Sequence, residues 1–130
     1  MFTLDQIKAA HSKVKSGADF PLYIRDLIKL GVLSYENPVS NGNTQYHGKD
    51  GFVIESGAKY STLEISELSN KIQFEQDLKI HQQGKTNYPT FCNDCAKSGV
   101  VKWIVDLTNM TCIYYDKKGN EVLMEKIPTV

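Results

Sequence analysis

Apolar residues along the chain follow two periods, one of about 3.6 residues and one of two residues. The longer period predicts α-helices over residues 4–15, 20–30, 69–83 and 88–98. Asp19 and Asn87 are helix-capping residue types, and each stands two positions before a proline suited to a first helical turn. Each predicted helix ends at a glycine that can take the left-handed conformation: Gly17, Gly31, Gly84 and Gly99. The pattern therefore predicts two pairs of consecutive helices.

The two-residue period follows each helix pair and predicts β-strands. The expected strands are residues 33–39, 44–48 and 52–56 after the first pair, and 101–107, 111–116 and 121–127 after the second. Turn residues separate them, such as Asn41-Gly42 and Asp50-Gly51 in the first half. Residues 57–67 join the two halves, and their partial alternation would also allow a short strand.

The two halves resemble one another when the sequence is shifted against itself by 68 positions (88 − 20), which aligns residues 20–51 with residues 88–119. Nine of the 32 aligned pairs are identical, where ordinary composition gives about two by chance. The identities are Pro21/Pro89, Asp26/Asp94, Lys29/Lys97, Gly31/Gly99, Val32/Val100, Asn41/Asn109, Tyr46/Tyr114, Lys49/Lys117 and Gly51/Gly119. Most stand at helix starts, helix ends and turns, so they have roles in folding.

The predicted fold is therefore α+β, a tandem duplication of an α-α-β-β-β unit with an antiparallel sheet. We expect one domain, with the first repeat at about residues 3–56, a linker at about 57–67 and the second repeat at about 68–127. Neither unit can bury its sheet face alone, so the two units are expected to pack about a pseudo-twofold axis.

Composition excludes several classes of protein. Fifteen basic and fifteen acidic residues cancel at neutral pH, which argues against an electrostatic grip on nucleic acid or on a membrane surface. The N-terminal residues 1–17 contain Asp5 and have no apolar run of signal-peptide length. Three cysteines, an odd number, fit a reducing compartment better than a disulfide framework. We therefore expect a cytoplasmic location and no nucleic-acid or membrane partner.

The segment HQQGKTNYPTFCNDCAKSGVVKWIVDLTNMTCIYYDKKGNEVLMEKIP resembles the C-terminal half of the YbcV-like proteins, the DUF1398 family. GADFPLYIRDLIKLGV and QYHGKDG are similar to its N-terminal half, so the resemblance covers nearly the whole chain. Members are sometimes labelled phage envelope protein, which implies an association with phage. The family has no established activity, cofactor or catalytic residues, so the resemblance leaves the function open.

The cysteines are the first candidates for chemistry. Cys92 and Cys95 have C-x-x-C spacing, and Cys112 and His81 could complete a zinc site. However, the pair falls inside a predicted helix, and no second C-x-x-C exists, so small buried hydrophobic residues are the favoured interpretation. A Cys–His nucleophile would also need an orienting residue and an oxyanion loop, which the sequence does not supply. We expect no metal and no cofactor.

Aromatic residues concentrate on the predicted strands, where packing is their usual role. The alternative is a ligand pocket at the seam between the repeats, since tyrosine and tryptophan offer apolar faces with a polar edge. The candidate ligand-binding residues are Tyr35, Tyr46, His47, His81, Trp103 and Tyr114. Positions where the repeats differ, such as Thr44 against Cys112, indicate which half would carry the site.

Two functions follow from these patterns. The favoured one is a non-enzymatic binding or interaction protein that uses the sheet face or the seam, with a homodimer through a free sheet edge as one form. The alternative is a small-molecule-binding protein or an enzyme with an aromatic-lined pocket. No group of residues specifies a reaction, so enzymatic activity is not expected.

Overall fold

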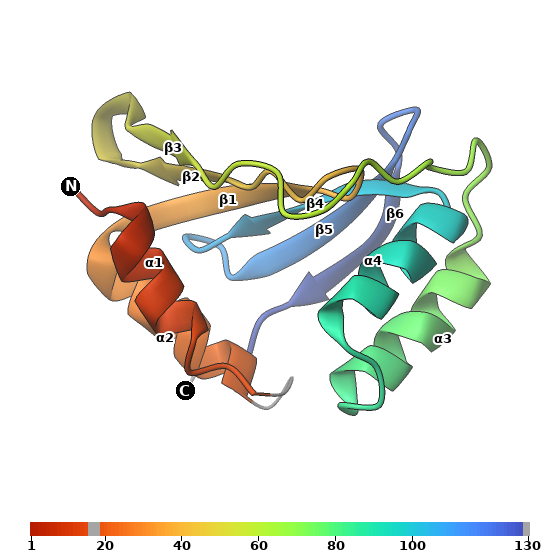
Figure 1. The fold of residues 1–130 in the computed structure, drawn as a ribbon, viewed down its shortest axis with the longest axis horizontal. Helices are drawn as coiled ribbons and strands as arrows, with labels where there is room; N and C mark the ends of the chain where they lie inside the picture. Colours follow the sequence, from red (N-terminus) through yellow and green to blue (C-terminus); the bar gives the residue numbers. More distant parts are fainter. Residues whose placement is uncertain (16–18, 129–130) are drawn as a thin grey trace.

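The chain folds into four helices and a six-stranded sheet in a computed structural model that describes residues 1–15 and 19–128 (Figure 1). The elements of the first half are α1 (Leu4–His11), α2 (Phe20–Leu30), β1 (Val32–Pro38), β2 (Gln45–Gly48), the short 3-10 helix η2 (Lys49–Gly51) and β3 (Val53–Glu55). Those of the second half are α3 (Lys71–Gln82), α4 (Tyr88–Lys97), β4 (Val100–Asp106), β5 (Thr111–Asp116) and β6 (Glu121–Lys126). The α+β class and the order of the elements are as predicted.

The sheet is antiparallel throughout, with the strand order β3-β2-β1-β4-β5-β6. Each half contributes three neighbouring strands, and β1 pairs with β4 at the centre, where Tyr35 lies opposite Val105. The sheet is therefore one continuous surface, which the sequence left open against two facing meanders. Strands β3 and β6 form its two edges.

All four helices cover one face of the sheet, α1 and α2 over the first half and α3 and α4 over the second (Figure 1). The burial of the strands alternates accordingly: Tyr35, Tyr46, Trp103 and Tyr114 point to the helices and are buried. Among the described residues, no helix is long and apolar enough to cross a membrane.

The helix ends agree with the predicted caps at most positions. Asn87 caps α4 by accepting a hydrogen bond from the Thr90 amide at 2.9 Å. Asp19 stands at the N-cap position of α2 as predicted, but its carboxylate makes no capping bond and instead accepts from the Lys15 amide at 2.9 Å. Helix α1 ends at His11, one turn earlier than predicted. Gly17, the expected end of that helix, lies outside the described residues.

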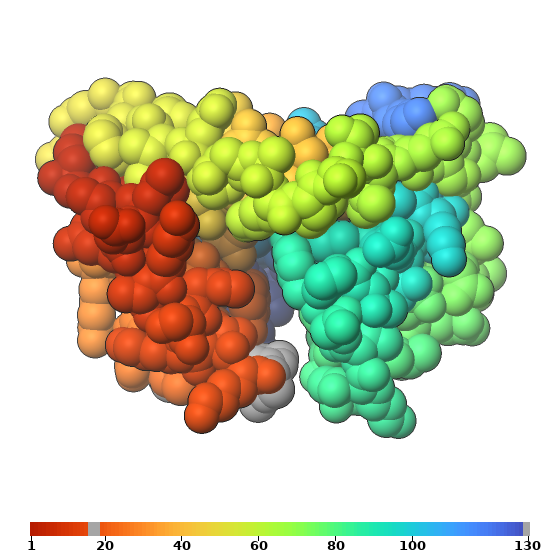
Figure 2. Space-filling model, viewed as in Figure 1, coloured from red at the N-terminus to blue at the C-terminus, as the bar shows by residue number. Residues whose placement is uncertain are grey.

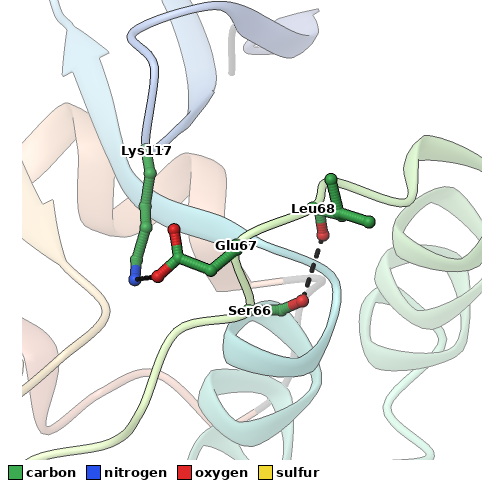
Figure 3. A network of polar contacts seen from close by, with 4 residues as sticks. All are labelled: Ser66, Glu67, Leu68 and Lys117. Carbon is green, nitrogen blue, oxygen red and sulfur yellow. Dashed lines mark hydrogen bonds and ion pairs between the residues drawn. The ribbon is translucent and has the colours of Figure 1, made fainter.

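Residues 57–67 form no strand; they run as an irregular segment that is tied to both halves. At its start, the Lys59 amide donates to Asn41 O at 2.8 Å, and the Tyr60 hydroxyl donates to Val39 O at 2.6 Å. At its end, Glu67 pairs with Lys117 of the β5–β6 turn at 2.6 Å, as Figure 3 shows. The linker is therefore part of the folded structure and crosses from one helix pair to the other.

Candidate functional site

The space-filling view shows a hollow between the α1–α2 pair and the α3–α4 pair, with the linker running across its upper end (Figure 2). We call this region the seam. Tyr35, on the central strand β1, is buried where the two halves meet, because Tyr23 of α2, Tyr46 of β2, Tyr88 of α4 and Cys112 of β5 all act on its phenol. Burial raises the pKa of the Tyr35 phenol, and the surrounding phenols and thiol raise it further. Both halves of the protein therefore supply hydroxyl groups to one place.

A chain of hydrogen bonds runs through the buried part of the seam. The Thr44 hydroxyl donates to the Asn37 side-chain oxygen at 2.7 Å, and the Tyr88 hydroxyl donates to the same oxygen at 3.3 Å. The Lys59 ammonium donates to the Thr44 oxygen at 3.1 Å. Asn37 and Thr44 are 3% and 1% exposed, although both are polar. Buried polar side chains are costly unless they are hydrogen-bonded, and this network satisfies both of them.

Cys92 of α4 lies beside this network, flanked by the hydroxyl groups of Tyr60 and Tyr88. Burial raises the pKa of the Cys92 thiol, while the two hydroxyls and the Lys59 charge act in the opposite direction. Burial likewise raises the pKa values of Tyr60 and Tyr88. The group therefore presents protonated hydroxyls and a thiol at neutral pH.

A second aromatic cluster fills the space under α3 and α4. The Trp103 ring lies 5.9 Å from Tyr114 and 5.7 Å from Phe91, measured between ring centroids. His81 stacks on Phe91 at 4.4 Å with an interplanar angle of 11°, and its Nδ1 lies 3.1 Å from the Thr86 carbonyl oxygen. This cluster is a packed part of the core, and His81 is held at the end of α3, where its position suits the helix dipole.

The structure separates the six predicted ligand-binding residues into three places. Tyr35 and Tyr46 are neighbours in the seam, with ring centroids 5.6 Å apart. Trp103, Tyr114 and His81 belong to the second cluster. His47 lies on the opposite face of the sheet from Tyr46, because it pairs with Ser34 while Tyr46 pairs with Tyr35. His47 therefore does not join the other five.

The cysteines do not form a common cluster with histidine or carboxylate groups. Cys92, Cys95 and Cys112 are all buried and unpaired with one another. Burial raises the pKa of all three thiols, to about 12 for Cys112. Within residues 1–15 and 19–128, no group of three or more His, Cys, Asp or Glu side chains is arranged to hold a metal ion. Protonated buried thiols pack as small apolar groups.

Several residues of the seam were missed by sequence reasoning: Tyr23, Asn37, Thr44 as a network member, Lys59, Tyr60 and Tyr88. Tyr88 follows the predicted cap of α4, so it was assigned to a helix start. Asn37 stands two positions after Tyr35 on β1, so the two-residue strand period places it on the same, helix-covered face. A polar residue at such a position is the signal that was available in the sequence.

The side chains of the seam offer little for acid–base chemistry. It combines phenol rings, neutral hydroxyl donors and acceptors, the thiols of Cys92 and Cys112 and one ammonium group. Burial raises the pKa of each phenol and thiol described here, so none is prepared to act as a base at neutral pH. Such a set of groups suits an aromatic molecule with a polar edge.

Comparison with known proteins identifies the family. The sequence profile of one family, described as "Protein of unknown function (DUF1398)", matches residues 8–126. No curated protein matches the chain. The matched segment runs from the second turn of α1 to the last residue of β6, so it contains every element that contributes to the seam. The chain therefore belongs to the DUF1398 family of proteins of unknown function.

Proposed function

We propose that this protein is a non-enzymatic binding protein and that its ligand is a small aromatic molecule held in the seam. The observation that carries this proposal is the convergence of hydroxyl groups from both halves around Tyr35. Two of the predicted site residues, Tyr35 and Tyr46, belong to this group, and Tyr23 and Tyr88 complete it. Sites for small molecules commonly combine aromatic walls with a few polar groups of this kind.

A tandem duplication, with the two units related by a pseudo-twofold axis, would explain why the site is asymmetric. At the offset of 68, the network residues Asn37 and Thr44 correspond to Val105 and Cys112. All four side chains are buried on the helix-covered face; Asn37 and Thr44 share a hydrogen bond of 2.7 Å, whereas Val105 has no polar side-chain atom and Cys112 offers only a thiol beside Tyr114. In this proposal, one unit acquired the polar network and the other kept an apolar core.

Thermal unfolding in the presence of small aromatic compounds tests the proposal. We expect compounds such as phenol or benzamide at millimolar concentration to raise the melting temperature, because ligands that bind only the folded state stabilise it. The increase should become smaller in Tyr35→Phe and Tyr88→Phe, which each remove one hydroxyl from the seam. Tyr115→Phe is the matched control, since Tyr115 pairs with Lys102 and Glu121 outside the seam.

A protein partner is the second candidate, and the face of the sheet that no helix covers, here called the bare face, favours it. This face carries the Glu36–Lys102 ion pair at 3.2 Å, with Lys102 5.6 Å from the Tyr115 ring centre. If no compound raises the melting temperature, binding through this face becomes the better explanation. A homodimer through a free edge of the sheet, a cytoplasmic location and the association with phage stay predictions. Gel filtration at high protein concentration tests the predicted dimer, and elution at the mass of a monomer would contradict it.

A further inference from the structure

We propose that the ligand of the seam carries a carboxylate group and that the Lys59 ammonium group binds it. This inference rests on the proposed function, because it names the class of molecule that the seam takes: an aromatic carboxylic acid in its ionised form. The proposal depends on where the Lys59 side chain lies and on which charges surround it.

The Lys59 side chain connects solvent with the buried network. The residue is exposed, yet its ammonium group lies 3.1 Å from the oxygen of Thr44, which is almost fully buried. An ammonium group has three N–H donors, and the bond to Thr44 uses one of them. Desolvation lowers the pKa of Lys59, as expected for a charge drawn from solvent toward a protein interior.

The acidic groups of the described residues do not neutralise this charge. The ion pairs found there join Lys13 to Asp26, Lys71 to Glu75, Lys102 to Glu36 and Lys117 to Glu67. None of them includes Lys59. Besides the Thr44 hydroxyl, the Lys59 charge acts on the protonated Cys92 thiol and on His11, whose pKa it helps to lower. An anion placed there would meet one positive charge and neutral donors.

The chemistry of the surrounding groups favours a carboxylate over a phosphate. One ammonium balances a single negative charge, whereas a phosphate monoester carries nearly two at neutral pH and is usually held by several cations. The phenol rings of Tyr35, Tyr46 and Tyr88 offer apolar contact to an attached ring. Benzoate is the simplest molecule with both features, and benzamide is its neutral counterpart of nearly the same shape.

The test compares the two compounds on the full-length protein, using the fluorescence of Trp103, the one tryptophan of the chain. Trp103 pairs with the network residue Asn37, so its emission should respond to a ligand in the seam. We expect benzoate to bind about tenfold more tightly than benzamide, the usual gain from a charge-assisted hydrogen bond. Lys59→Met should abolish this tenfold difference between benzoate and benzamide.

Two further variants make the result specific. Lys59→Arg keeps the positive charge and should keep most of the preference for benzoate. Lys118→Met removes an exposed charge from the β5–β6 turn and should change neither affinity. Equal binding of benzoate and benzamide by the wild type, or an unchanged preference in Lys59→Met, would overturn the carboxylate inference alone. Failure of both compounds to bind would overturn the proposed function as well.

Discussion

Single residues in the seam are polar and buried at once, so their hydrogen bonds matter for stability. Thr44 is the centre of the network, because it donates to Asn37 and accepts from Lys59. A hydroxyl in this position can be replaced by a methyl group with little change of shape, which isolates the contribution of the hydrogen bonds. The expected cost is that of leaving buried polar partners less well satisfied.

Thr44→Val should lower the free energy of unfolding by about 1–3 kcal/mol, since Asn37 would lose its shortest hydrogen bond. Thr111→Val is the control: Thr111 also lies on a strand but faces the bare side of the sheet, and its effect should stay within about 0.5 kcal/mol. Chemical denaturation of both variants measures the difference. Equal effects would mean that the network does not stabilise the fold.

The buried thiols should make stability depend on pH in the alkaline range. The pKa of Cys112 is raised to about 12 in the folded protein, from an ordinary value near 9. The protonated Cys112 thiol stabilises the folded state fully below pH 9. This stabilisation is lost as the pH rises from 9 toward 12, because the thiol releases its proton at a lower pH in the unfolded chain than in the folded protein. Cys112 contributes about 1.4 kcal/mol per pH unit in that range. Cys112→Ala should therefore show a shallower loss between pH 9 and 10.5 in denaturation experiments; an unchanged slope would contradict this cause.

The site was predicted only in part, for reasons that lie in particular residues. Strand alternation accounts for the position of Tyr35, Tyr46, Trp103 and Tyr114 on one face and of His47 on the other. It could not show that α2 and α4 bring Tyr23 and Tyr88 to Tyr35, because those contacts depend on how the helix pairs lie on the sheet. The sequence pattern did not indicate Lys59 as a seam residue for the same reason, since Lys59 belongs to the irregular linker.

Helices, strands and turns follow the sequence pattern more closely than the site does. The strands agree with the prediction to within one or two residues, because alternation and the turn residues fix both of their ends. The linker differs: its partial alternation resembled a strand, but its backbone bonds to loop and helix-end residues such as Asn41 and Ala96. A two-residue period without a neighbouring strand does not make a strand.

Two glycines at equivalent helix ends should respond differently to the same substitution. Gly31 has φ +99 and open space around it, so Gly31→Ala should cost about 1 kcal/mol from backbone strain alone. Gly99 has φ +78, but an added Cβ would lie 2.5 Å from the carbonyl oxygen of Leu68, the residue that directly follows the linker. Gly99→Ala should therefore cost roughly 2–4 kcal/mol. Denaturation midpoints measure both, and equal losses would show that the linker is not held against the end of α4.

The whole molecule should unfold as one unit, because β1 and β4 join the two halves into a continuous sheet. Trp103 fluorescence reports on the second half, and the backbone amide signals of β2 report on the first. We expect the two probes to give the same denaturation midpoint, as for a two-state domain. Separate transitions would mean that the halves are independent, and a site shared between them would then lose its structural basis.

The most direct test of the account is nuclear magnetic resonance of protein labelled with carbon-13 in its tyrosine rings. The chain has seven tyrosines, which include Tyr35, Tyr46 and Tyr88 of the seam and also Tyr115 on the bare face. On titration with benzamide, the signals of Tyr35, Tyr46 and Tyr88 should shift together and saturate, while that of Tyr115 stays unchanged. No shift at the three seam residues, or a shift at Tyr115 alone, would contradict the claim that the seam is the binding site.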